Sequence, residues 1–284
     1  MALVVNTNIA SLNAQRNLTS SGNQLAVTLQ RLSSGLRVNS AKDDAAGLAV
    51  AQAFTAQIRG NSQAVRNAND GISLGQTAEG ALGQIAGNVQ RIREIAVQAA
   101  NGTISNTNRS QLQKEVDQLT QEISRIVSTT QFNGTNLLSG ASTLTFQVGA
   151  DGTSTQQVSV TTTNLAVTGG TGLFTFSGSL TATGTVDVTT QANASAALAN
   201  LDSDISQVST IRSTFGAVQN RFEAVISSLQ NYVENLESSR SRILDADFAA
   251  ETANLTRGQI LQQAGTAVLS QANALPQTAL SLLR

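Results

Sequence analysis

The residue types that do most protein chemistry are rare in this chain. It contains no Cys and no His, which excludes thiol nucleophiles, histidine-based triads, disulfides and almost every zinc site. Paired acids such as Asp43 with Asp44 and Asp245 with Asp247 remain, and neighbouring carboxylates can act as general acid and base. Both pairs stand where we expect helices to begin, and there a carboxylate caps backbone N–H groups. We therefore predict no catalytic residue, no metal, no cofactor and no enzyme activity.

The residues of the segment 90–98 indicate a site that binds a partner. Arg91, Ile95 and Gln98 are spaced to lie on one face of a helix, next to the face that carries Ile92. This spacing predicts that Ile95 is partly exposed beside an arginine, a combination that is typical of interfaces. We predict an interaction site here. A contact between copies of the chain is the simpler alternative, and the two do not exclude each other.

A long helix must position this segment. Ser40-Ala-Lys-Asp43 has the form of a capping box, in which the Ser40 hydroxyl accepts from the Asp43 N–H and the Asp43 carboxylate reaches back. We predict a helix from here to about Ala100. Its many glycines indicate close helix–helix approach, with a break near Gly60 or Gly71 as the alternative. Its apolar seam alternates threes and fours: Leu82, Ile85, Val89, Ile92, Ala96 and Ala99.

The two ends of the chain carry apolar stripes that are too narrow to fold alone. In the first stripe the leucines are separated by four, three and four residues: Leu25, Leu29, Leu32 and Leu36. In the second stripe the apolar residues are separated alternately by three and four residues: Leu261, Ala264, Val268, Ala272, Leu275, Ala279 and Leu282. Because each stripe needs a partner, we predict that the helix 1–35 pairs with a helix that begins after Asp247.

The middle of the chain combines two more helices with a hairpin. One apolar seam predicts a third helix: Leu112, Val116, Leu119, Ile123 and Ile126. A second seam predicts a long fourth helix that begins at about residue 192: Ile211, Phe215, Val218, Phe222, Val225, Leu229, Tyr232 and Leu236. Between them threonine dominates, and the alternation in 144–148 and 158–160 predicts a β-hairpin. A second strand pair is expected at 173–176 and 186–188.

The composition favours a protein that packs against copies of itself. Only 12% of the 284 residues are charged, against about 25% in ordinary domains. The net charge of −1 gives no basic field for nucleic acid. No apolar run reaches membrane-spanning length. The run 2–5 is too short for a signal-peptide core, so we expect export to leave the N-terminus uncut.

These elements predict a mainly α fold, a long coiled-coil helical rod with paired terminal helices and a small β-hairpin region in the middle of the chain. We expect residues 1–44 and 240–284 to form an inner terminal helix pair. Residues 45–140 and 191–239 would form an outer helical bundle, with 141–190 as a Thr-rich hairpin segment at its outer end.

Several segments of the chain, in this order, resemble bacterial flagellin. They are Asn-Thr-Asn at 6–8, Leu-Ser-Ser-Gly-Leu-Arg-Val-Asn-Ser-Ala-Lys-Asp-Asp-Ala-Ala-Gly at 32–47, Arg-Asn-Ala-Asn-Asp-Gly-Ile at 66–72, Gln-Phe-Asn-Gly at 131–134, Ala-Val-Gln-Asn-Arg-Phe at 217–222, Ser-Arg-Ser-Arg-Ile at 239–243, Gln-Ile-Leu-Gln-Gln-Ala-Gly at 259–265 and Leu-Ser-Leu-Leu-Arg at 280–284. The similarity covers about 1–140 and 195–284. The short segment between them suggests a flagellin without large outer domains.

The resemblance implies a structural subunit that self-assembles into the extracellular flagellar filament for swimming. It implies a monomer that is exported unfolded, with ends that become ordered on polymerisation. The terminal stripes would carry assembly, through Leu25, Leu29, Leu32, Leu36, Leu261, Val268, Leu275 and Leu282. The alternative is a hook–filament junction protein, another axial protein or a non-polymerising scaffold.

The resemblance also implies partners. The 90–98 segment is similar to the one that the host Toll-like receptor senses, with Arg91, Ile95, Gln98 and Glu115 as contacts and Ile95 where leucine is usual. The cytosolic NAIP sensors would read the terminal leucines, for which inner packing is the simpler role: Leu280, Leu282 and Leu283. The C-terminal helix resembles the segment bound by the export chaperone FliS. The export apparatus and the cap and junction proteins complete the implied partners.

Overall fold

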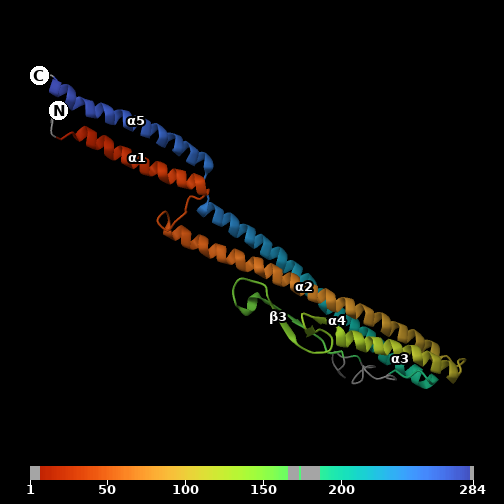
Figure 1. The fold of residues 1–284 in the computed structure, drawn as a ribbon. Helices are drawn as coiled ribbons and strands as arrows, with labels where there is room; N and C mark the ends of the chain where they lie inside the picture. The colour runs from red at the N-terminus through yellow and green to blue at the C-terminus, as the bar shows by residue number, and fades with distance from the viewer. Residues whose placement is uncertain (1–6, 166–172, 174–185, 282–284) are drawn as a thin grey trace. The chain divides into compact units, whose positions relative to one another are not determined.

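Five α-helices make up most of the computed structural model, which describes residues 7–165, 173 and 186–281 and, within 275–281, the backbone alone. The helices follow one another along the chain (Figure 1): α1 (Ile9–Ser34), α2 (Ala45–Ala100), α3 (Asn106–Thr129), α4 (Gln191–Leu244) and α5 (Phe248–Ser281). Between α3 and α4 lie four short strands: β1 (Gln131–Phe132), β2 (Thr135–Asn136), β3 (Thr143–Gln147) and β4 (Gln157–Thr161). A single 3-10 turn (Ser154–Gln156) precedes β4. The predicted mainly α fold with a small hairpin is confirmed.

The chain divides into two units. The terminal unit comprises Met1–Ile58 and Glu234–Arg284, and the central unit comprises Arg59–Val233. Helices α2 and α4 therefore each contribute residues to both units.

Helix α1 ends as its sequence predicts. Gly35 has a φ of 71°, the left-handed conformation that glycine adopts at low cost, and its N–H donates to the carbonyl of Arg31 at 2.8 Å. At the other end the Asn8 side chain accepts from the N–H of Ser11 at 3.0 Å. Both caps satisfy backbone groups that a helix end leaves unpaired.

Helix α2 begins later than predicted, and its cap differs. The Asp44 carboxylate accepts from the Gly47 N–H at 2.8 Å, so Asp44 caps the helix and Ser40 does not. Asp43 does reach back, accepting from the Ser40 N–H at 2.9 Å and the Ser40 hydroxyl at 3.0 Å. The predicted capping box is therefore wrong in one half, because the Ser40 hydroxyl donates. The N–H of Ser40 and then its hydroxyl lower the pKa of Asp43.

Helix α2 runs without a break through its glycines, and other segments approach it closely at some of them. A methyl group on Gly71 would lie 2.5 Å from Cζ of Phe222 on α4, and one on Gly60 would lie 2.9 Å from Cβ of Ala150. The alternative of a break at either glycine is excluded by the continuous helix. The predicted close helix–helix approach holds at Gly71 but not at Gly80, Gly83 and Gly87, where an added Cβ would meet nothing within 4 Å.

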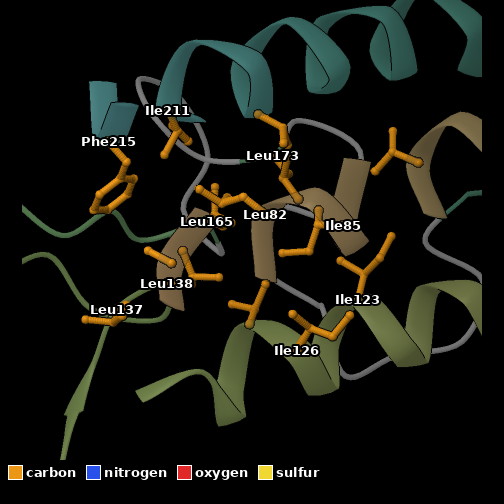
Figure 2. Close-up of a cluster of buried hydrophobic side chains, with 14 of the residues drawn as sticks. Leu82, Ile85, Ile123, Ile126, Leu137, Leu138, Leu165, Leu173, Ile211 and Phe215 are labelled. Atoms are coloured by element: carbon orange, nitrogen blue, oxygen red, sulfur yellow. The ribbon is translucent and has the colours of Figure 1, made fainter. Parts of the chain in front are cut away.

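The apolar core of the central unit combines three helices with the segments that join them (Figure 2). All of the predicted α2 seam is buried. Around it lie side chains from α3, from α4 and from the connecting segments: Ile123, Ile126, Leu137, Leu138, Leu165, Leu173, Ile211 and Phe215. The close packing of these side chains supplies the main hydrophobic stabilisation of the unit.

Strands β3 and β4 form the predicted hairpin. Leu144 is opposite Val160 and Phe146 is opposite Val158. The ring of Phe146 meets that of Phe222 edge to face, with centroids 5.4 Å apart, which fixes the hairpin to α4. Of the second predicted strand pair, 174–176 lies outside the described residues, and Leu173 and 186–188 lie in no strand.

A second, two-residue hairpin was not predicted. Strands β1 and β2 are joined by Asn133 and Gly134, whose φ angles are 47° and 79°. Positive φ at both positions is the tight turn that Asn-Gly favours between strands. The local signal was present in the sequence.

Candidate assembly and recognition surfaces

Helices α1 and α5 lie side by side and antiparallel in the terminal unit (Figure 1). The start of α1 meets the end of α5, since the Asn8 side-chain amide donates to the carbonyl of Ala272 at 2.7 Å. The less exposed residues alternate threes and fours on each helix, which is a coiled-coil seam. They are Ser11, Ala14, Leu18, Ser21, Leu25, Thr28 and Leu32 on α1, and Glu251, Leu255, Gly258, Gly265, Leu269 and Ala272 on α5. The predicted pairing of the terminal helices is confirmed.

The α1 seam includes only part of the predicted stripe. Leu25 and Leu32 are half-buried on it, but Leu29 is 49% exposed and Thr28 takes the inward position. Leu36 lies beyond the helix end, where its backbone bridges to Asp245. Placing Leu29 in the seam was therefore wrong, because the inward spacing runs three-four-three through this part of the helix.

The α5 seam is rotated away from the predicted stripe. Leu261 is 48% exposed and Val268 is 57% exposed, whereas Gly258 and Gly265 face α1. The sequence pattern placed the larger apolar side chains inward, and for these two residues it was wrong. Leu275 lies in α5, but its side chain is outside the described residues, as is all of Leu282.

The outer surface of the helix pair carries most of the large apolar side chains that are exposed in the described part of the chain. They are Ile9, Leu12, Val27 and Leu29 on α1, and Phe248, Ile260, Leu261 and Val268 on α5. Eight such side chains lie on two helices that bury little apolar surface of their own, which makes them candidates for contacts with another copy. We name these eight residues the outer apolar surface.

Polar contacts mark both ends of the seam. The Arg31 guanidinium lies 3.6 Å from the buried Glu251 carboxylate. Near the other end the Ser11 hydroxyl donates to the Asn273 side chain at 2.7 Å. Polar groups at seam positions fix the register of paired helices at some cost in stability.

A non-local cap holds the base of the pair. The Arg37 guanidinium donates to the carbonyl of Ile243 at 2.7 Å, and the Arg37 N–H donates to that of Leu244 at 2.6 Å. The Ala246 N–H in turn donates to the carbonyl of Gly35 at 3.0 Å. The last carbonyls of α4 are thus satisfied by a segment more than 200 residues away. No local sequence signal predicts such a contact.

Arg91 and Glu115 are brought together across α2 and α3. The Arg91 Nε donates to Glu115 at 2.9 Å, and its Nη1 donates to Glu94 at 2.9 Å. The hydrogen bond to Glu94, then the one to Glu115, raises the pKa of Arg91. The result is an exposed charged surface that joins two helices, with Gln98 exposed near it on α2.

Ile95 does not belong to that surface. Its side chain is 1% exposed, so the expected partial exposure was wrong. Helix α2 packs within a bundle, and its buried stripe is wider than a two-position seam. The exposed apolar side chain nearby is Val97, at 50%.

The predicted terminal leucines fall at the edge of the described chain. Leu280 lies in α5 without a described side chain, and Leu282 and Leu283 lie outside the described residues. Across the residues that the structure describes, no group of three or more acidic side chains is placed to hold a metal ion. None of the described helices is both long enough and apolar enough to cross a membrane.

Two family models match most of the chain. The "Bacterial flagellin N-terminal helical region" matches residues 5–143, and the "Bacterial flagellin C-terminal helical region" matches residues 198–283. These ranges contain the whole of α1, α2, α3 and α5 and nearly all of α4.

Full-length relatives carry the same family name. Flagellin from Halalkalibacterium halodurans is 44% identical over 99% of this chain and 100% of its own length. Flagellin from Xenorhabdus nematophila is 46% identical over the whole of both chains. A solved putative flagellar hook-associated protein from Vibrio parahaemolyticus is 14% identical, with a TM-score of 0.58 over 72% of this chain and 100% of that chain, and it shows the fold alone. With matching family models at both ends and relatives aligned throughout, the chain belongs to the bacterial flagellins.

Proposed function

We propose that the chain assembles into the helical flagellar filament through the outer apolar surface. As a flagellin it is a structural subunit of the extracellular filament. The observation that carries the proposal is the exposure of Leu261 and Val268 on α5 and of Leu12 and Leu29 on α1. Burying each such side chain against a neighbouring copy contributes about 1.5–3 kcal/mol. Contacts between two different faces of successive copies generate an open helical polymer. In the flagellum this polymer serves swimming.

The terminal helix pair is also the basis for a proposed export route. On α1 and α5 the described residues that are buried are Thr28, Glu251 and Ala272, so the pair has little apolar core of its own. Helices with so little burial are marginal in water. We propose that these ends fluctuate before assembly, which keeps the monomer exportable in unfolded form through the flagellar export apparatus. The chaperone FliS would cover the apolar face of α5 in the cytoplasm, and the cap and junction proteins would receive the exported chain.

Sedimentation with electron microscopy tests the assembly proposal. Leu261→Ser with Val268→Ser should abolish pelleting, because both side chains would be buried only in the polymer. Val50→Ser, a change at an exposed valine outside α1 and α5, is the matched control and should pellet normally. A chain without residues 245–284 should stay soluble. Polymerisation of the double serine variant at the parent's concentration would refute the proposal.

The same experiment separates the alternative function. The hook-associated neighbour shares the fold, so a junction or other axial role remains the competing proposal. A junction protein stays in the supernatant, whereas a filament subunit pellets. Failure of the unmodified chain to polymerise, even when seeded with sheared native flagellar filaments, would favour the junction role.

We propose further that the surface around Arg91 is sensed by the host Toll-like receptor. Support comes from the exposed Arg91–Glu115 pair, which presents fixed charges from two helices, and from the exposed Gln98. The buried Ile95 would act by holding α2 in place rather than by touching the receptor.

Receptor-reporter cells treated with purified monomer test this role. Arg91→Ala and Glu115→Ala should each reduce potency, whereas Arg125→Ala, which removes an ion pair within α3, should not. Equal loss in all three would point to a general defect.

For the NAIP sensors, we propose recognition of the C-terminal leucines. Removal of 280–284 should then abolish the response to protein delivered into the cytosol, and an unchanged response would exclude these leucines.

A further inference from the structure

Two leucines of α1 lie against two glycines of α5 with the same spacing. Leu18 and Leu25 are seven residues apart, and so are Gly265 and Gly258. A methyl group on Gly265 would lie 3.0 Å from Cδ1 of Leu18, and one on Gly258 would lie 3.1 Å from Cδ1 of Leu25. A Cβ at either position would require its leucine to move by a few tenths of an ångström, and a larger side chain would need the space that the leucine fills. The absence of side chains at these two positions lets the helices approach this closely.

The same glycines determine which face of α5 is turned outward. Leu261 and Val268 each follow a glycine of the seam by three residues, and three residues turn a helix by about 300°, which leaves them about 60° from the seam. Helix α5 thus carries two neighbouring stripes that could face α1. One consists of Gly258 and Gly265, and the other contains the larger Leu261 and Val268.

We propose that Gly258 and Gly265 are specificity-determining residues for the pairing of α1 with α5 of the same chain. By receiving Leu25 and Leu18 they select the glycine stripe as the inner face. Leu261 and Val268 then remain outside, available to another copy. Only this last consequence rests on the proposed filament function, because the pairing itself is a property of one chain.

The polar contacts at the ends of the pair agree with this register. Arg31 meets Glu251 at one end, and Ser11 meets Asn273 at the other. Both contacts require the rotation of α5 in which its glycines face inward. The leucine–glycine contacts therefore act together with polar contacts that lie on either side of them.

Disulfide trapping in the isolated chain tests the proposal. Because the chain has no Cys, Ser11→Cys with Asn273→Cys introduces a single reporter pair at side chains that touch in the structure. The protein is oxidised below the concentration at which it sediments, and intrachain and interchain products are separated on non-reducing gels. Because the ends fluctuate before assembly, the rate of intrachain crosslinking measures how often α1 and α5 pair within one chain, and the parent should give the intrachain product.

The variants Gly258→Leu and Gly265→Leu fill the two spaces. Leucine is a better helix former than glycine, so a loss of pairing cannot come from helix propensity. We expect intrachain crosslinking to slow about tenfold or more, as in overpacked contacts. Gly22→Leu on α1, where an added Cβ meets nothing within 4 Å, is the matched control and should crosslink at the parent's rate. Combining Gly258→Leu with Leu25→Ala, which reverses the large and small partners, should recover most of the rate.

Crosslinking at the parent's rate in both leucine variants would overturn the proposal, whatever they do in sedimentation. So would a parent that forms mainly interchain product, because the partner of α5 would then be a second copy. If the parent crosslinks within the chain but never pellets, the filament proposal fails and the pairing inference stands.

Discussion

The central and terminal units are both built from long helices, but they bury different kinds of side chain. In the central unit Leu82, Ile85 and Ile123 are fully enclosed, and every residue of the continuous apolar core belongs to this unit. Along α1 and α5 the seam mixes half-buried leucines with small and polar residues, and eight other large apolar side chains are exposed. One unit is complete as a single chain, whereas the other leaves its apolar surface to be covered.

This difference matches what an assembling subunit requires. A self-sufficient core lets the subunit fold before it meets a neighbour. If copies supply the stability that these ends lack, as the assembly proposal expects, their order would depend on assembly. Substitutions in the two units should then differ in what they do to the free energy of unfolding.

Ile85→Ala should lower the free energy of unfolding of the central unit by about 2–5 kcal/mol, because it opens a cavity among fully buried side chains. Val97→Ala removes apolar atoms from the same helix at a position that is 50% exposed, and should change it by less than about 0.5 kcal/mol. Urea denaturation followed by circular dichroism measures both. Similar losses in the two variants would mean that α2 lacks the distinct inner face described here.

Arg109→Leu should lower the free energy of unfolding by about 1–3 kcal/mol, because it leaves buried carbonyls without hydrogen-bond donors. The side chain is 5% exposed, and it donates to the carbonyls of Ala99 at 2.7 Å and Asn101 at 2.9 Å. Hydrogen exchange should speed up at the turn between α2 and α3. Arg125→Leu, at an exposed arginine of α3 paired with Glu122, is the control, and an effect as large as that of Arg109→Leu would argue against a capping role.

Asp187→Asn should reduce stability near neutral pH and have less effect in acid. The Asp187 carboxylate accepts from the hydroxyl and then the N–H of Thr189, which lowers its pKa below the ordinary 3.8. A carboxylate with a lowered folded pKa stabilises above its unfolded pKa, and this contribution is lost as pH falls through the folded pKa. Urea midpoints of parent and variant should therefore differ near neutral pH and converge in acid, once the pH falls below the lowered pKa. An equal difference at both pH values would show that the charge is not involved.

Asp43→Asn provides the same test in the terminal unit. Hydrogen bonds from Ser40 lower the pKa of Asp43, so the sign of the pH effect is the same. Loss of the Asp43 carboxylate should speed hydrogen exchange at the start of α2 and leave exchange in the central core unchanged. Altered exchange within α3 would contradict the separation of the two units.

Val268→Ala should have the smallest effect on the monomer, less than about 0.5 kcal/mol, because the side chain is 57% exposed. The same variant should raise the concentration needed for polymerisation. Thermal denaturation of the monomer and sedimentation of the polymer measure the two effects separately. Destabilisation of the monomer comparable to that of Ile85→Ala would place Val268 in a core and remove the contrast between the units.

Local sequence signals were sufficient for the extent of most elements. The glycine at 35 ended α1, the alternation around Phe146 set the register of the hairpin, and the seam through Leu82 and Ile85 identified the core face of α2. These features depend on neighbours in the chain, and periodicity reports such neighbours directly. The Asn133-Gly134 hairpin belongs to the same class and was overlooked.

Contacts between distant segments decided the rest. Apolar spacing on α5 favoured Leu261 and Val268 as its inner face, but in the structure two leucines of α1 pack against Gly258 and Gly265 instead. Ile95 is buried because α2 packs within a bundle, and Arg37 caps a helix that ends more than 200 residues later. The amino-acid sequence by itself determined the helices, the hairpin and the family resemblance. Only the tertiary structure determined which faces are buried, because that depends on how closely a partner far away in the chain can approach.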